Sequence, residues 1–325
     1  MKNFEYPEGA TPIDDISGLK ISWVTTQAHL NMVEAENIAL AIEKYLTKSI
    51  NAPTSWFTVA NLQRIHKDMF DDVWDWAGIF RTTQTIPGVR PYQIQSALKD
   101  LCDDVFYWNQ NGCEMTFLEQ AAQIHHRLVL IHPFPNGNGR FSRIVADRYL
   151  KGWKCSMPLW PNEIQKESQA RKLYIKALRL ADAGDYSLLM EFTKKYGGKD
   201  PSLGELLISP FYKAEIKKNN LAKLIKANLK HNPNVNETIN DHHPLHLAIK
   251  QGFKEIVQML IQTGADLHYK DKSGFTSFEL AIVRNQLSIA KMICDHGYPY
   301  IPRKPLPPKL LNYYAYIYEF DRRYF

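Results

Sequence analysis

The sequence has few cysteines and no long hydrophobic run. Its four cysteines form no Cys-x-x-Cys pair, which argues against a disulfide framework and against a thiolate metal centre of common spacing. No apolar stretch approaches the roughly 20 residues that cross a bilayer, and the N-terminus lacks the apolar core of a signal peptide. We therefore expect a reduced protein that folds in a cytosol and has no membrane span.

A strong excess of one charge is also lacking. The net charge is +6 over 325 residues and is spread along the chain, so it favours acidic partners only mildly and gives no argument for nucleic-acid binding. The length exceeds that of one small core, which indicates at least two domains.

Residues 1–200 read as a mainly helical domain. Apolar residues recur at helical spacing over residues 27–46 and 59–73. Thr116-Phe-Leu-Glu119 has the form of a capping box and predicts the start of a helix that ends near Pro133. We expect an all-α fold for this domain.

One segment interrupts the helical pattern. Between Arg81 and Gln95, polar and apolar residues alternate around Pro87-Gly88. This pattern predicts a short β-hairpin, which we call the flap (residues 81–95).

The last third of the chain contains an internal repeat. The boundary is predicted at Gly-Gly-Lys-Asp-Pro-Ser, around residue 200. Pro-Leu-His-Leu-Ala248 recurs around Ala281, and the two alanines are 33 residues apart, which is the ankyrin period. We predict an ankyrin-type α-solenoid of about three repeats in residues 207–300, the first one degenerate. We expect residues 301–325 to cap it.

Residues 132–143, His-Pro-Phe-Pro-Asn-Gly-Asn-Gly-Arg-Phe-Ser-Arg, combine the features of an anion site with a base. We call them the 132–143 segment. Gly137 and Gly139 let the backbone approach a phosphate at a new helix start, where N–H groups and the helix dipole favour negative charge. Arg140 and Arg143 share a helix face and can bind further phosphate oxygens. His132 can accept a proton near neutral pH. Nucleophilic attack on phosphorus follows from these residues alone.

The same segment resembles the signature of the Fic/Doc family, His-x-Phe-x-(Asp/Glu/Asn)-Gly-Asn-Gly-Arg-x-x-Arg. The resemblance extends to Trp76-Ala-Gly-x-Phe-Arg81 and to Ile124-His-His-Arg-Leu-Val129, covers about residues 1–200, and is closest to the bacterial branch called mobile mystery protein B. It implies a Fic-type helical bundle. It also implies a protein adenylyltransferase that transfers AMP from ATP to a Ser, Thr or Tyr hydroxyl of a target protein.

The resemblance implies a role for each matching residue. His132 is the base, and Phe134 anchors the loop. The nucleotide phosphates are bound by Asn136, Gly137, Asn138, Gly139, Arg140 and Arg143. The flap aligns the target by strand addition, through Ile86, Gly88, Val89 and Tyr92.

Two positions qualify this reading. Asn136 stands where many relatives carry a carboxylate that holds Mg²⁺, and a neutral amide is a weaker ligand for that cation. We therefore expect Mg²⁺ to enter with ATP.

The family's inhibitory pattern, (Ser/Thr)-x-x-x-Glu-(Gly/Asn), is matched in part by Glu36-Asn37, with Met32 in place of the hydroxyl residue. We hypothesise that Glu36, in the candidate inhibitory helix 27–46, pairs with Arg143 and blocks ATP.

Several alternatives stay open at this point. The donor could be phosphocholine or UMP instead of ATP, or the chain could be a weakly catalytic interaction scaffold. For the leading reading we expect the ankyrin repeats to recruit the protein substrate. We expect the bacterial cytoplasm as the site of folding, with translocation into a host cytosol as an effector. The sequence leaves the oligomeric state open.

Overall fold

The computed structural model describes residues 18–48, 53–161, 164, 168–216, 218–231 and 234–298. The predicted cap, residues 301–325, lies outside these residues. The chain divides into two compact units after Pro201, and Gly112–Glu114 joins the second unit. Within the described ranges both units are helical, and strand pairing is limited to isolated bridges. The expected all-α class is confirmed.

The first unit contains seven α-helices and two short helical turns within its described part. They are α1 (Gln27–Ile42), the π-helical turn η1 (Glu43–Thr47), α2 (Val59–Phe70), the 3₁₀ turn η2 (Pro91–Gln93), α3 (Ile94–Asn111), α4 (Phe117–Ile131), α5 (Asn138–Gly152), α6 (Gln169–Asp182) and α7 (Ser187–Lys195). The Thr116–Glu119 capping box is present and starts α4 as expected, because each side chain accepts the other residue's backbone N–H.

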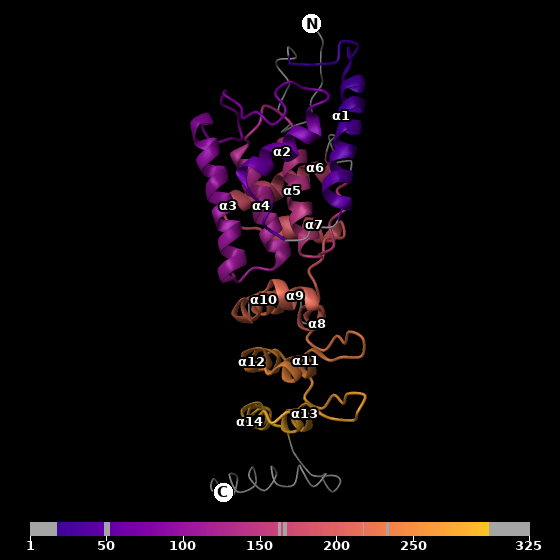
Figure 1. Cartoon of the computed structure of the whole chain (residues 1–325), viewed down its shortest axis with the longest axis vertical. Helices are drawn as coiled ribbons and strands as arrows, with labels where there is room; N and C mark the ends of the chain where they lie inside the picture. The colour runs from indigo at the N-terminus through magenta and orange to yellow at the C-terminus, as the bar shows by residue number, and fades with distance from the viewer. Residues whose placement is uncertain are drawn as a thin grey trace, which may run out of the picture. The chain divides into compact units, whose positions relative to one another are not determined.

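Helices α4 and α5 form the centre of the first unit (Figure 1). Their inward faces carry fully buried apolar residues, including Leu128 on α4 and Phe141 on α5. Helix α1 packs against α2, and its buried stripe includes Leu30. Because α4 ends and α5 begins at the 132–143 segment, the best-packed part of the unit holds that segment in place.

The flap differs from the expected hairpin. Residues 81–90 form an irregular extended loop without a strand pair, and the chain then enters η2 and α3. Pro87 and Pro91 have no N–H to donate to a ladder. Gln84 Nε2 instead bonds the carbonyl of Gly88 at 3.0 Å, so side chains take the place of strand pairing.

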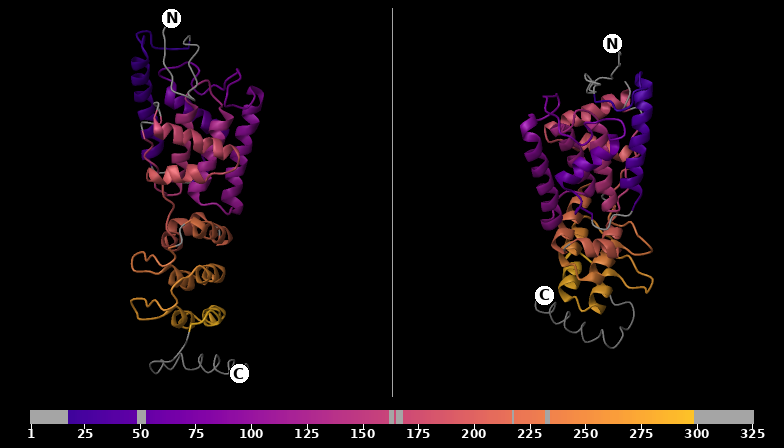
Figure 2. Two further views of the ribbon diagram at one scale, coloured as in Figure 1. Left: turned by 180° about the vertical axis from the view of Figure 1, so that it is seen from behind. Right: turned by 45° about the horizontal axis from the view of Figure 1, so that its top comes forward.

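The second unit is a stack of helix pairs, which both figures show at its α11–α14 end (Figures 1 and 2). Its described helices are α8 (Leu203–Ile208), α9 (Pro210–Glu215), α10 (Lys218–His231), α11 (Pro244–Gln251), α12 (Lys254–Gln262), α13 (Ser277–Val283) and α14 (Leu287–Asp295). Gly252 has the positive φ of 69° that the turn between α11 and α12 requires, and Asn285 replaces it in the next pair with φ 56°. No helix in the described part of the chain is long and apolar enough to cross a membrane.

Candidate functional site

His132 lies at the C-terminal end of α4 in the left-handed region of backbone space, with φ 50°. That conformation is costly for a residue with a Cβ and is typical of sites where the surrounding structure imposes it. The imidazole is buried, and Nδ1 lies 3.2 Å from the carbonyl oxygen of Val129. Since a carbonyl only accepts, Nδ1 carries the proton and Nε2 is the basic nitrogen.

Burial lowers the pKa of His132 to about 4, with a smaller contribution in the same direction from the nearby charge of Arg81. The hydrogen bond to Val129 acts in the opposite direction. The ring is therefore neutral at physiological pH, which is the form that can remove a proton.

The loop after His132 is closed by the side chain of Asn138. Its Oδ1 accepts the N–H of Phe134 at 3.0 Å, and its Nδ2 donates to the carbonyl of Phe134 at 2.8 Å. Asn138 was expected to bind phosphate, but its buried side chain is used to shape the loop. Its backbone N–H lies at the first turn of α5, where N–H groups have no partner within the helix.

Phe134 anchors the loop in the core, since its side chain is fully buried. It stacks on His66 of α2, with ring centroids 3.6 Å apart. Gly137 caps α5 with φ 76°, and a Cβ there would lie 2.5 Å from the Phe70 ring. Gly139 is different, because an added Cβ would meet only Arg143 Nη1, at 3.7 Å.

His66 is a site residue that the sequence reasoning missed. Its Nδ1 accepts the N–H of Gly78 at 3.0 Å, and its Nε2 lies 3.0 Å from the carbonyl of Asn136. Burial lowers the pKa of His66 to about 3, so the ring stays neutral with its proton on Nε2. His66 therefore ties the 132–143 segment to the turn after α2. The sequence hint of this contact was the segment Trp76-Ala-Gly, which belongs to the family resemblance and contains Gly78, the residue that donates to His66.

Among the described residues, Glu34 of α1 forms an ion pair with Arg140 of the 132–143 segment. Glu34 is buried, and its Oε2 lies 2.6 Å from Nη1 of Arg140. Its Oε1 accepts the indole N–H of Trp74 at 2.8 Å. Glu36, the sequence-based choice, is exposed on α1. Helical spacing could have predicted the burial of Glu34, because Glu34 lies four positions after the buried Leu30 and therefore on the same helix face. Glu36 lies six positions after Leu30 and faces away from it.

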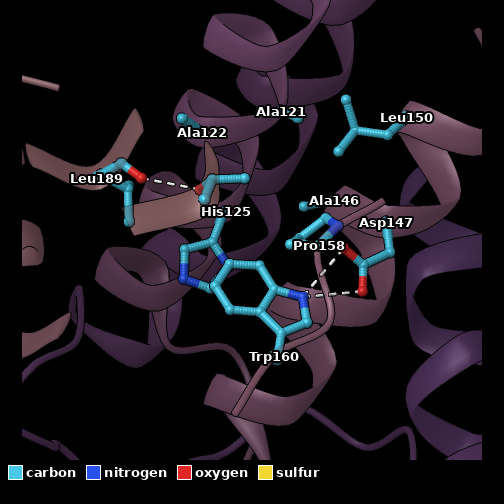
Figure 3. Close-up of a pocket in the computed structure, with 10 residues that line it drawn as sticks. Ala121, Ala122, His125, Ala146, Asp147, Leu150, Pro158, Trp160 and Leu189 are labelled. Carbon is cyan, nitrogen blue, oxygen red and sulfur yellow. Dashed lines mark hydrogen bonds between the residues drawn. The ribbon is translucent and has the colours of Figure 1, made fainter. Parts of the chain in front are cut away.

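Arg143 lies near Trp160, one of the residues that line a small pocket in the first unit (Figure 3). Its guanidinium carbon is 6.0 Å from the centre of the Trp160 ring. The Trp160 N–H bonds both oxygens of Asp147, at 3.0 and 2.9 Å. Burial raises the pKa of Asp147 to about 7, against the opposing effects of Trp160 and Arg143. Arg140 is thus ion-paired with a carboxylate of α1, whereas the charge of Arg143 acts on a carboxylate of α5.

The flap residues divide into exposed and covered ones. Ile86 is 98% exposed and Tyr92 is 75% exposed, whereas Gly88 and Val89 are partly covered. The Val89 N–H donates to the carbonyl of Ile131 at 3.3 Å. This bond places Val89 of the flap beside the end of α4, and the side chains of Ile86 and Tyr92 project into solvent.

Asn136 offers little to a metal ion. Its side-chain oxygen accepts the N–H of Gly137 at 2.5 Å. In the part of the chain that the structure describes, no group of three His, Cys, Asp or Glu side chains could hold a metal.

Comparison with known proteins finds two families along the chain. Residues 56–150 match the Fic/DOC family, and residues 211–302 match ankyrin repeats in three copies. Both resemblances inferred from the sequence are confirmed.

Individual relatives match over part of the chain. The protein adenylyltransferase fic-1 of Caenorhabditis elegans is 31% identical over 126 residues, which are 37% of this chain and 23% of that protein. The protein adenylyltransferase Fic of Culex quinquefasciatus is 31% identical over 157 residues, 47% of this chain and 30% of its own length. The chain thus spans less than a third of either relative.

Among solved structures, residues 134–508 of C. elegans Fic-1 align at 24% identity with a TM-score of 0.42, covering 55% of this chain and 56% of that one. BepC of Bartonella tribocorum, a VirB-translocated effector with bound AMPPNP, aligns at 18% identity with a TM-score of 0.43, covering 61% of this chain and 97% of that one.

Proposed function

We propose that this chain, which carries a Fic/DOC domain followed by ankyrin repeats, transfers AMP from ATP to a Ser, Thr or Tyr hydroxyl of a target protein. One observation carries the proposal. The neutral His132, with its proton on Nδ1, lies at the start of a loop that leads into the N-terminus of α5 and its two arginines. The adenylyltransferase names of the relatives that match the first unit support the same reaction.

The proposed reaction is one displacement at phosphorus. Nε2 of His132 takes the proton from the target hydroxyl, whose oxygen attacks the α-phosphorus of ATP. The bond from the α-phosphorus to the bridging oxygen of the β-phosphate breaks, and pyrophosphate leaves. Backbone N–H groups at Asn138 and Gly139 and the guanidinium groups of Arg140 and Arg143 stabilise the charge on the phosphates.

We propose that Mg²⁺ enters on the phosphates of ATP. Asn136 contributes a neutral oxygen that already accepts a backbone N–H, so it is a minor ligand. Mg²⁺ neutralises charge on the phosphates when bound, and the residues of this chain orient the nucleotide and remove the proton.

We also propose that α1 restrains the enzyme. The ion pair between Glu34 and Arg140 occupies a guanidinium that ATP needs, so nucleotide binding has to break it. Glu36 with Arg143 remains the alternative pair from the sequence motif.

We propose that the ankyrin repeats recruit the target protein. Ankyrin units bind through their extended surfaces, and the repeats here form a unit with its own buried core. Folding in a bacterial cytoplasm and translocation into a host as an effector stay predictions, and the two curated adenylyltransferase relatives described above are from animals.

The test is incubation with ATP labelled at the α-phosphate, followed by detection of label on protein. We expect label with the wild-type chain and none with His132→Ala, because that change removes the base proposed to take the proton. His231→Ala, a change at an exposed histidine of α10, serves as the matched control. Equal labelling by wild type and His132→Ala would contradict the mechanism. Label that appears with UTP or CDP-choline but not with ATP would reassign the donor.

A further inference from the structure

Arg81 joins the flap to the 132–143 segment through one buried side chain. The residue is 3% exposed, and its guanidinium donates to four backbone carbonyls. On the flap these are Thr83 at 2.7 Å and Val89 at 2.5 Å. At the end of α4 they are Ile131 at 3.2 Å and His132 at 2.6 Å.

The backbone adds to the same junction. The Arg81 N–H donates to the carbonyl of Pro133 at 3.0 Å, and the Val89 N–H donates to that of Ile131 at 3.3 Å. The flap has no strand pair of its own among the described residues, and these bonds connect it to the end of α4. Donation by several N–H groups of a rigid, planar guanidinium gives that connection a defined geometry.

The charge of Arg81 is held by carbonyl oxygens. Within the described residues it makes no ion pair with a carboxylate, and its burial lowers its pKa below the usual value for arginine. A charge that no carboxylate neutralises acts on its neighbours at longer range. One such neighbour is His132, whose carbonyl Arg81 binds and whose pKa it lowers.

The flap sequence leaves room for this side chain at Gly88. Its φ is 151°, and a Cβ at that position would lie 2.4 Å from Oγ1 of Thr85 and 2.6 Å from Nη2 of Arg81. A side chain at Gly88 would therefore displace the guanidinium or the flap.

We propose that Arg81 is a positioning residue, which fixes the flap relative to His132 so that a hydroxyl carried by a target segment on the flap meets Nε2. The proposal rests on the proposed adenylyl transfer, and it adds a role for an arginine that does not itself contact the nucleotide. The proposal has two parts that can be tested separately. The geometric statement is that the hydrogen bonds of Arg81 hold the flap in place, and the charge statement is that the charge of Arg81 lowers the pKa of His132.

The geometric statement is tested with Arg81→Lys and Gly88→Ala. Lysine keeps the charge but cannot bond four carbonyls at once, and the methyl group introduced by Gly88→Ala pushes on an intact guanidinium. We expect both variants to bind ATP with near wild-type affinity, measured by calorimetry, and to incorporate labelled AMP into themselves about a hundredfold more slowly, since misplacement near 1 Å can have that effect. Hydrogen exchange at the Val89 amide should accelerate in both.

The matched control is Arg127→Met, which removes an arginine of α4 that pairs with Asp104 at 2.6 Å on the surface. It should change neither exchange at Val89 nor AMP incorporation. Arg81→Lys that labels as fast as wild type, or that leaves exchange at Val89 unchanged, would overturn the geometric statement.

The charge statement is tested by NMR titration of His132 in wild type, Arg81→Lys and Arg81→Met. Removal of the charge in Arg81→Met should raise the pKa of His132 above that of the wild type, whereas Arg81→Lys should not. Neither the titration nor the exchange measurement needs catalysis. A chain that never incorporates AMP would contradict the proposed function, while these two measurements would still decide the role of Arg81. An unchanged pKa in Arg81→Met would overturn the charge statement.

Discussion

Glu34 and Glu36 are two positions apart on α1, and this spacing places them in different environments. Glu34 is buried between Trp74 and Arg140, whereas Glu36 is exposed. A carboxylate out of water needs partners for its oxygens, and Glu34 has them from elements outside α1. The inhibitory motif selects Glu36, which Asn37 follows, because the motif describes sequence and not the depth of a helix face.

At this scale we predict that Glu34→Gln raises AMP incorporation. The amide keeps an oxygen for the Trp74 N–H but loses the attraction for Arg140, which is then available to ATP. Labelled-ATP assays of the two variants Glu34→Gln and Glu36→Gln measure the effect, the second serving as the matched control. We expect a rise of about fivefold to a hundredfold for a pair of this kind, in the range of about 1–3 kcal/mol of coupling.

The opposite pattern would decide between the two carboxylates. If Glu36→Gln activates the enzyme and Glu34→Gln does not, the motif-based pairing with Arg143 is right and the pair seen here is structural. If neither change activates, α1 has no inhibitory role.

The 132–143 segment forms its loop through bonds made within the element. Asn138 closes it on Phe134, and Gly137 provides the positive φ at which α5 begins. The sequence predicted the loop and the new helix because glycine and asparagine have specific backbone preferences. The outer support, His66, comes from α2, 70 residues away from Asn136, and only the folded chain brings the two together.

At the element scale, Gly137→Ala should destabilise the first unit by about 1–3 kcal/mol, because the backbone would be strained at positive φ and the methyl group would meet the Phe70 ring. Gly139→Ala is the comparison, since that methyl group has only an ordinary contact. Thermal denaturation followed by circular dichroism measures both. Equal unfolding temperatures for the two variants would contradict this account of the loop.

For the flap, the prediction from the sequence pattern was wrong. Alternation around Pro87-Gly88 predicted a hairpin, yet the segment is an extended loop bonded through Arg81 and Gln84. An alternation of polar and apolar residues indicates which side chains face solvent. It does not indicate whether the backbone forms hydrogen bonds with a second strand. A buried arginine that replaces strand pairing leaves no periodic signal in the sequence.

At the scale of the whole molecule, the two units have separate cores. Leu245 and Ile249 of α11 are fully buried within the second unit, as Phe141 and Leu128 are within the first. The repeat was visible in the sequence because each helix pair uses the same buried positions. Three copies are present, as predicted.

We predict that Leu245→Ala weakens target labelling but preserves self-labelling. The cavity should destabilise the second unit by about 2–5 kcal/mol, while the residues proposed for catalysis lie in the first. Label in a lysate and label on the chain itself are measured in one reaction, near the unfolding temperature of the variant. Lys254→Ala, on the exposed side of α12, is the control. Unchanged target labelling after the repeats unfold would contradict recruitment by this unit.

The helical class, the repeat with its period, and the residues of the 132–143 segment can be predicted from the amino-acid sequence. These depend on local backbone preference, on periodic burial and on contacts between residues close in the chain. The folded chain is needed to show that Glu34 pairs with Arg140, that the Asn138 side chain closes the loop, and that His66 and Arg81 support it. Each of these depends on burial and on partners far apart in sequence, and a single sequence carries no direct record of either.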